Sequence, residues 1–296
     1  MTLPFARENR KVRSVLRTWL PNQHGAWFIV TVPALFGATL GGWAWQHALL
    51  LSAWMIGFFF VFSALRLIKN PRKKSLRYPV FIYGILVGVL GIGVLAVLPL
   101  LCWWIPAFAI LIGIWAGEVR LGRERGLGAR LTIILAAGLM TLVAYHCGLM
   151  ATALRMGQDA MYGVHEASAL GGHALSTVLR GWPAAIAIAV QLTAYYAASV
   201  PYVKTIFRQR GNQRFLVISI VSHALGFAAA LYFASLSWVS PLVAVAWLVT
   251  LARSIWFPLA GTPARQALAT TSRRADRSGN LSIDFCGSSA VKVAEV

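Results

Sequence analysis

Residues 47–79 read HALLLSAWMIGFFFVFSALRLIKNPRKKSLRYP, an apolar run that passes directly into a cationic turn. As a helix rising 1.5 Å per residue, the run from 47 to 68 is long enough to cross a hydrocarbon core of roughly 30 Å. It has to be helical, because lipid offers no hydrogen-bonding partner to the backbone. The turn that follows carries lysine and arginine but no acid. This stretch predicts a membrane span that ends at the cytoplasmic surface.

The same pattern recurs along the whole chain. Of its 296 residues, 58% are hydrophobic and 12% are charged, so a water-soluble fold would lack the polar residues to cover its apolar surface. The predicted fold class is therefore all-α, a polytopic transmembrane helix bundle within residues 25–258. It follows a basic segment, 1–24, and precedes a disordered cytoplasmic tail, 259–296. We expect eight spans: 25–45, 47–68, 79–99, 100–117, 131–150, 181–203, 215–236 and 239–258.

The basic residues set the predicted orientation. They gather in the amino-terminal segment, in every second connection and in the tail, whereas the opposite side carries only Arg155 and Arg180. By the positive-inside rule, both termini are cytoplasmic in a bacterial plasma membrane. Because the net charge of +19 is spread over short connections, it does not indicate a nucleic-acid-binding domain. The two basic hairpins would hold equivalent places in two sets of four helices, which suggests a 4+4 internal repeat.

The two basic hairpins also provide candidate anion-binding residues. Arginine can hold phosphate through bidentate hydrogen bonds, and lysine can hold it as a point charge. The alternative is that these charges only set topology and attract acidic lipids, each contributing on the order of 1 kcal/mol. The candidates are Arg66, Lys69, Arg72, Lys204 and Arg208.

Polar residues near or inside the predicted spans give further candidates. Asn22, Gln23 and His24 form an interface polar cluster in LPNQHGAW, residues 20–27, where Asn22 suits a helix N-cap. Gln191 and His223 lie deeper. Each of these two could act as a relay or ligand, or could simply hydrogen-bond a neighbouring helix.

The sequence predicts no metal site and no cofactor. The three cysteines, Cys102, Cys147 and Cys286, are too far apart to form a metal framework. Cys102 and Cys147 share the outer end of neighbouring helices, so they either form a disulfide or remain free thiols. The outer connection, 151–180, matches no zinc motif, and we expect it to be a solvated loop.

Small residues at a spacing of four predict close helix packing. Such pairs let the backbones of neighbouring membrane helices approach each other. In the first half of the chain they are Gly37 with Gly41, Gly84 with Gly88, and Gly113 with Gly117.

Several of these segments resemble the YwiC-like family of integral membrane proteins. The resemblance rests on LPNQHGAW with VPALFG, LIKNPRKKSLRYP, RERGLGARL with GLM, and SVPYVKTIFRQRGNQR with HAL, along residues 20–258. Where the family pattern usually has Asn-Asp, this chain has Gly128-Ala129-Arg130, so no role passes to a carboxylate there. The resemblance implies a membrane protein rather than a particular activity.

A more distant likeness is to the UbiA-type prenyltransferases. Their working loops are the corresponding cytoplasmic connections, in which aspartate-rich motifs hold magnesium and diphosphate. Neither basic hairpin of this chain contains aspartate or glutamate, so that metal-dependent mechanism does not transfer.

Three hypotheses for function follow. The first is binding of an anionic lipid or an isoprenoid phosphate at the basic hairpins, without nucleic acid as a partner. The second is a membrane transporter with Gln191 and His223 along its path. The third is a scaffold for another membrane complex that uses the small-residue faces.

Overall fold

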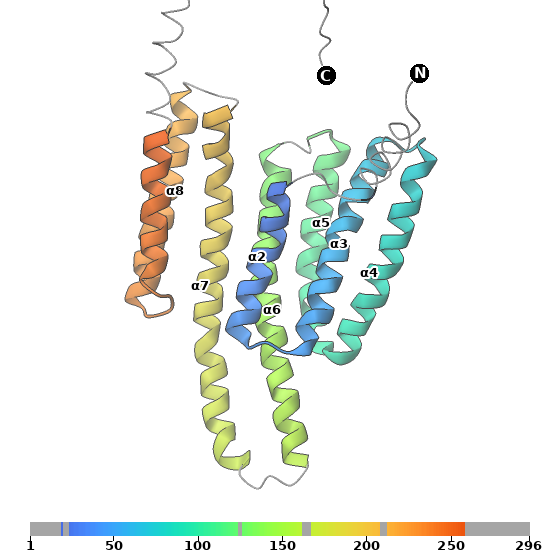
Figure 1. Ribbon diagram of the computed structural model, residues 1–296, viewed down its shortest axis with the longest axis vertical. Helices are drawn as coiled ribbons and strands as arrows, with labels where there is room; N and C mark the ends of the chain where they lie inside the picture. The colour runs from blue at the N-terminus through green and yellow to red at the C-terminus, as the bar shows by residue number, and fades with distance from the viewer. Residues whose placement is uncertain (1–18, 20–23, 124–125, 162–166, 208–211, 258–296) are drawn as a thin grey trace, which may run out of the picture.

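The computed structural model describes residue 19 and residues 24–123, 126–161, 167–207 and 212–257. In chain order these residues form seven labelled α-helices and a final helix, with two short 3-10 helices between them (Figure 1). The α-helices are α2 (His24–Gly41), α3 (Trp45–Lys69), α4 (Arg77–Val97), α5 (Ile105–Arg120), α6 (Leu127–Met161), α7 (Ala167–Phe207) and α8 (Gln213–Ser235). The 3-10 helices are η1 (Lys74–Leu76) and η2 (Pro99–Trp104), and the final helix is Leu242–Phe257.

The predicted all-α bundle is confirmed. Six of the described helical segments are long and apolar enough to cross a membrane, and two shorter apolar helices, Ala26–Gly41 and Leu242–Phe257, accompany them. These eight segments correspond one for one to the eight predicted spans. Figure 1 shows the last turns of α3, α5 and α7 and the first turns of α4, α6 and α8 at one end of the bundle. The chain therefore gathers its basic connections at one end, as the positive-inside rule requires.

The outer connection differs from the predicted solvated loop. Helix α6 continues to Met161, and α7 already begins at Ala167. Figure 1 shows that both helices project beyond the ends of their neighbours. The prediction was wrong because 151–161 and 167–180 contain several Ala, Leu and Met residues and no proline, so nothing stops the helices where they leave the apolar layer.

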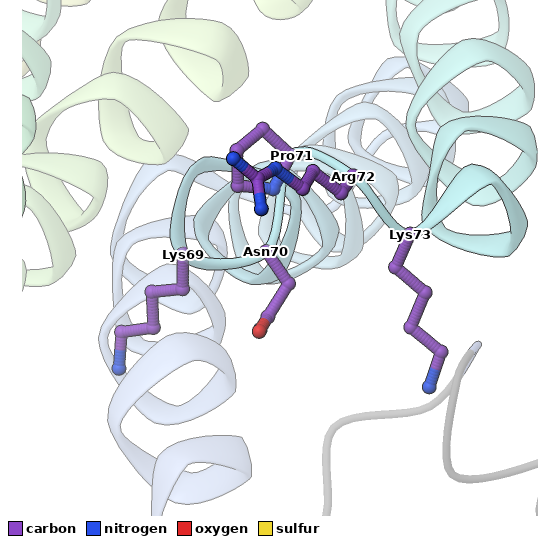
Figure 2. Close-up of a pocket in the computed structure, with 5 residues that line it drawn as sticks. All are labelled: Lys69, Asn70, Pro71, Arg72 and Lys73. Carbon is purple, nitrogen blue, oxygen red and sulfur yellow. The ribbon is translucent and has the colours of Figure 1, made fainter.

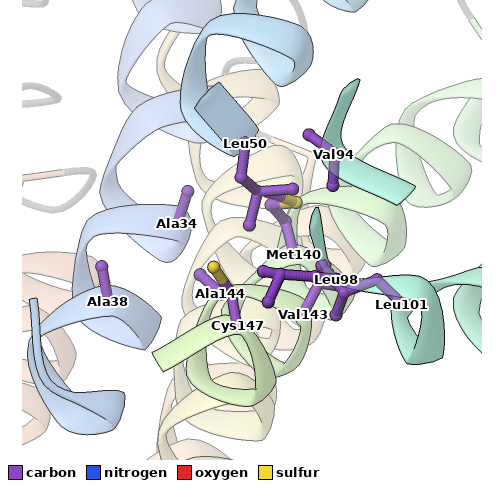
Figure 3. Close-up of a cluster of buried hydrophobic side chains, with 10 residues drawn as sticks. All are labelled: Ala34, Ala38, Leu50, Val94, Leu98, Leu101, Met140, Val143, Ala144 and Cys147. Atoms are coloured by element: carbon purple, nitrogen blue, oxygen red, sulfur yellow. The ribbon is translucent and has the colours of Figure 1, made fainter. Parts of the chain in front are cut away.

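The core lies around α6. Figure 3 shows side chains from α2, α3, α4, η2 and α6 packed together. Helix α2 packs most closely on α6, where a Cβ on Gly37 would collide with the carbonyl group of Thr141. A Cβ on Gly148 would collide with the backbone of Gly41. This part of the bundle thus depends on residues that lack side chains. The buried residues of this core are Ala34, Ala38, Leu50, Val94, Leu98, Leu101, Met140, Val143, Ala144 and Cys147.

The small-residue pairs thus divide into two groups. Close packing is confirmed for Gly37 and Gly41, which lie against α6, and for Gly84, where a Cβ would lie 3.3 Å from the Phe60 ring of α3. The packing prediction was wrong for Gly88, Gly113 and Gly117, because a Cβ there would meet no other described atom within 4 Å. A spacing of four shows that two small residues share a helix face, but it does not show which helix covers that face.

A second, smaller core joins α7, α8 and the final helix. Its buried residues are Ala198, Ala230, Ala244 and Trp247. Gly226 of α8 lies directly against the indole ring of Trp247. Figure 1 shows α8 and the final helix on the far side of α7 from α2 to α5. Because of this arrangement, α7 connects the two halves of the bundle.

Cys102 and Cys147 are both free thiols, so the disulfide alternative is not observed. Cys102 is exposed and Cys147 is buried. In a Cys286→Ser background, we expect a membrane-impermeant maleimide to label Cys102 from outside intact cells and to leave Cys147 unmodified. Mass spectrometry of the labelled protein measures both sites. Labelling of Cys102 only after the cells are opened would contradict the predicted orientation.

Candidate anion-binding site at the basic end of the bundle

The basic connection between α3 and α4 is a defined turn. Helix α3 ends at Lys69 because Asn70 precedes Pro71, and a residue before proline disfavours helical geometry. The Asn70 N–H donates back to the carbonyl oxygen of Arg66 at 3.1 Å. The Lys73 N–H then donates to the carbonyl oxygen of Asn70, also at 3.1 Å. These bonds fix the positions of the basic residues on the turn.

A hollow of about 440 Å³ lies at this turn and is lined by Lys69, Asn70, Pro71, Arg72 and Lys73. Figure 2 shows the ammonium groups of Lys69 and Lys73 on either side of the Asn70 amide, with the Arg72 guanidinium beside Pro71. The cations surround the turn and do not converge on one point. All five residues are exposed. Such an arrangement suits an anion with several oxygens, or several headgroups at once.

Exposed apolar side chains flank the turn. Ile68 comes just before the end of α3, and Tyr78 and Phe81 lie in the first two turns of α4. Tyr78 and Phe81 are each 69% exposed, and their spacing of three places them on one helix face. Aromatic rings at a helix end settle at the headgroup level of a bilayer. The turn therefore combines cations with an adjoining surface suited to acyl chains.

Arg66 lies one turn before the end of α3. Its guanidinium carbon is 5.5 Å from the centroid of the Phe62 ring, and the side chain is half-buried. This cation–π contact lets the aliphatic stem follow the apolar helix while the charge reaches toward the basic end.

The second basic hairpin lies apart from the first. Lys204 is in the last turn of α7, and its Nζ is 5.3 Å from the centroid of the Phe215 ring in α8. Figure 1 shows the last turn of α7 and the α3–α4 connection on opposite sides of α2 and α6. The structure therefore does not bring Lys204 together with Arg72. Arg208 lies outside the described residues.

The interface polar cluster is described only in part. His24 begins α2, in agreement with a helix start in LPNQHGAW. Asn22, Gln23 and the side chain of His24 lie outside the described part of the structure. The N-cap role of Asn22 stays a prediction.

Gln191 and His223 are both buried. Nδ1 of His223 donates to the carbonyl oxygen of Ser219 at 2.7 Å. Its ring lies against Tyr202 of α7 and Trp247 of the final helix, with centroid separations of 6.2 Å and 6.0 Å. The amide of Gln191 makes no hydrogen bond to the described residues. His223 therefore joins three helices, whereas the polar atoms of Gln191 lack partners there.

Two polar residues that contact other helices, His47 and Arg253, were absent from the sequence candidates. Nδ1 of His47 accepts from the Ala44 N–H at 3.1 Å, and its Nε2 donates to the carbonyl oxygen of Ala144 at 2.9 Å. The guanidinium carbon of Arg253 lies 4.6 Å from the centroid of the Tyr202 ring. Both residues are ionisable and lie within predicted spans, which could have marked them as candidates. Their contact partners Ala144 and Tyr202, however, lie far from them in the sequence.

The described bundle defines the chain as a multi-pass α-helical membrane protein, with several apolar helices and its basic connections at one end. Within that class, residues 20–145 match the family model described as YwiC-like protein. The resemblance is thus confirmed over α2 to α5 and the first part of α6. The segment SVPYVKTIFRQRGNQR lies beyond the matched residues. A search of curated proteins and a search of solved structures each found no significant match.

Proposed function

We propose that this YwiC-like membrane protein binds an anionic lipid, either a phospholipid or an isoprenoid phosphate, at the turn between α3 and α4. The observation that carries the proposal is the hollow at Lys69–Lys73. Its cations are exposed and its backbone is fixed by consecutive turns. A headgroup phosphate there gains charge-assisted hydrogen bonds without first having to order the turn.

The surroundings of the turn favour a lipid over a soluble anion. Ile68, Tyr78 and Phe81 expose apolar surface next to the cations. A free phosphate has no use for this surface, whereas the chain of a lipid covers it. The ligand we propose therefore has an anionic head and an apolar tail.

The chemistry of the turn favours binding over turnover. Residues 66–79 contain no aspartate or glutamate, and carboxylate oxygens are the usual protein ligands of Mg²⁺. Without a metal, cleavage of a diphosphate lacks its usual charge stabilisation. We therefore propose capture or presentation of the lipid as the activity of this turn.

The experiment removes two cations that lie on the hollow. In Arg72→Ala/Lys73→Ala, we expect the affinity for phosphatidylglycerol or a polyprenyl phosphate to fall about tenfold or more, since each cation near the surface contributes on the order of 1 kcal/mol. Native mass spectrometry of the purified protein, titrated with each lipid, measures the affinity.

The matched control is Arg120→Ala/Arg123→Ala. It removes the same charge from exposed residues at the same end of the bundle. We expect its lipid affinity to stay within about threefold of the parent protein, because neither arginine lines the hollow at the α3–α4 turn. Equal losses in the two double variants would show general attraction to acidic lipid and would overturn the proposal.

A further inference from the structure

A group of unpaired polar atoms lies between α7, α8 and the final helix. Ser219 and His223 of α8 are completely buried, and Arg253 of the final helix is half-buried. Nε2 of His223, Oγ of Ser219 and Nε of Arg253 have no hydrogen-bond partner among the described residues. Enclosed polar atoms of this kind are costly unless something pairs with them.

The hydrogen bond of His223 fixes what its free nitrogen can do. Its Nδ1 lies 2.7 Å from the carbonyl oxygen of Ser219. A carbonyl oxygen only accepts, so Nδ1 carries the hydrogen. In the neutral imidazole, Nε2 then presents a lone pair. The matching ligand atom is one that donates a hydrogen.

Arg253, in contrast, requires a ligand atom that accepts a hydrogen bond. Its guanidinium is permanently charged and only donates. It stacks on the Tyr202 ring at 4.6 Å, and the same ring contacts His223. The donor and the acceptor thus share one neighbourhood around a single aromatic ring.

The three helices provide no counter-charge. Aspartate and glutamate are absent from residues 167–207, 213–235 and 242–257. Among the described residues, no carboxylate pairs with Arg253. Charged residues within membrane segments are expensive and almost always paired. An anion from outside the chain would satisfy both this charge and the unpaired atoms.

We propose that Ser219, His223 and Arg253 form a binding site for a phosphate group that retains one acidic hydrogen. Its oxygens accept from the Arg253 Nε–H and the Ser219 hydroxyl, and its P–OH donates to Nε2 of His223. A phosphate monoester lipid and free inorganic phosphate both carry such a group, whereas a phosphodiester lipid does not. The ligand enters past Arg253, which is the least buried of the three. This site lies in the smaller core and is independent of the α3–α4 turn.

The test uses the full chain, labelled with ¹⁵N-histidine, in phosphatidylcholine nanodiscs. The probes are inorganic phosphate, phosphatidic acid as a monoester and phosphatidylglycerol as a diester. The His223→Gln variant assigns the His223 signals. We expect inorganic phosphate or phosphatidic acid to shift the Nε2 signal saturably, and phosphatidylglycerol to leave it unchanged. A response to only one of the two monoester-type probes assigns the source of the ligand.

Two variants test the donors. We expect Ser219→Ala to weaken binding about tenfold and Arg253→Gln about a hundredfold, the range for hydrogen bonds that involve charged groups. Ser219→Ala removes no charge, so it still tests the proposed site if Arg253→Gln does not fold. Arg72→Ala/Lys73→Ala should keep the full response, which separates this site from the proposed lipid-binding turn.

Three results would each overturn the site. They are no shift with inorganic phosphate or phosphatidic acid, an equal shift with phosphatidylglycerol, and unchanged affinity in both donor variants. The first would mean that water alone pairs with these atoms.

Discussion

Replacing Gly37 with leucine is expected to lower the free energy of unfolding by more than about 3 kcal/mol, the upper range for overpacking. A Cβ at this position already collides with the carbonyl group of Thr141 and lies 2.9 Å from the Cβ of Ala144. Both carbonyl atoms of Thr141 belong to the backbone, so no side-chain rotation relieves the collision with them. Helix α2 would have to separate from α6. Unfolding in mixed detergent micelles, followed by tryptophan fluorescence, measures the change.

Gly88→Leu is the matched control. Gly88 also lies within a membrane-spanning helix, but a Cβ there meets nothing within 4 Å among the described residues. We expect the free energy of unfolding to change by less than about 1 kcal/mol, the scale of helix propensity. If both variants lose the same stability, the α2–α6 packing is not the tight contact that the structure shows.

The second large effect is expected at His47. Its ring links the turn before α3 to the middle of α6 through two hydrogen bonds. In His47→Leu, the Ala44 N–H loses its acceptor, and the α3 to α6 link is lost as well. Leaving a buried donor unsatisfied costs about 1–3 kcal/mol, so we expect a loss of about 2–3 kcal/mol in the same unfolding assay.

The neighbouring Gln46→Leu substitution is the control for His47. Gln46 is also buried, but its Oε1 has no partner among the described residues. Replacing an unpaired polar group with an apolar one is nearly neutral or stabilising. The two adjacent variants should therefore differ by about 2 kcal/mol or more. A loss at Gln46 as large as that at His47 would contradict the role assigned to the His47 hydrogen bonds.

The basic turn was the part of the candidate site most open to prediction. The lysines and arginines of residues 69–77 identify the turn in the sequence. Asn70-Pro71 predicts the end of the helix, because proline restricts the residue before it. The sequence also suggested that Lys204 could act with Lys69 and Arg72. That grouping depends on how far apart α3 and α7 lie, and the intervening α2 and α6 separate them. Distance between non-adjacent helices is a property of packing.

The polar residues within the bundle show the same limit. His223 could be selected from the sequence because ionisable groups are rare in membrane spans. Its neighbours Tyr202 and Trp247 come from helices on either side of it in the chain. Arg253 was not among the sequence candidates, and its guanidinium lies on Tyr202. Periodicity places residues on a face, but it does not identify the facing helix.

Sequence alone determined the eight apolar helices, the end at which the basic connections gather, and the likeness to the YwiC-like family over residues 20–145. These follow from local quantities: the length of an apolar run, the position of charge and short motifs. Tertiary structure decided that Gly37 packs on α6 whereas no described residue covers Gly113, and that α6 and α7 extend beyond their neighbours. It also decided that Arg253 and His223 contact the same Tyr202 ring. In lipid every apolar face is equally soluble, so hydrophobicity does not select the partner of a helix; close fit and hydrogen bonding between helices do.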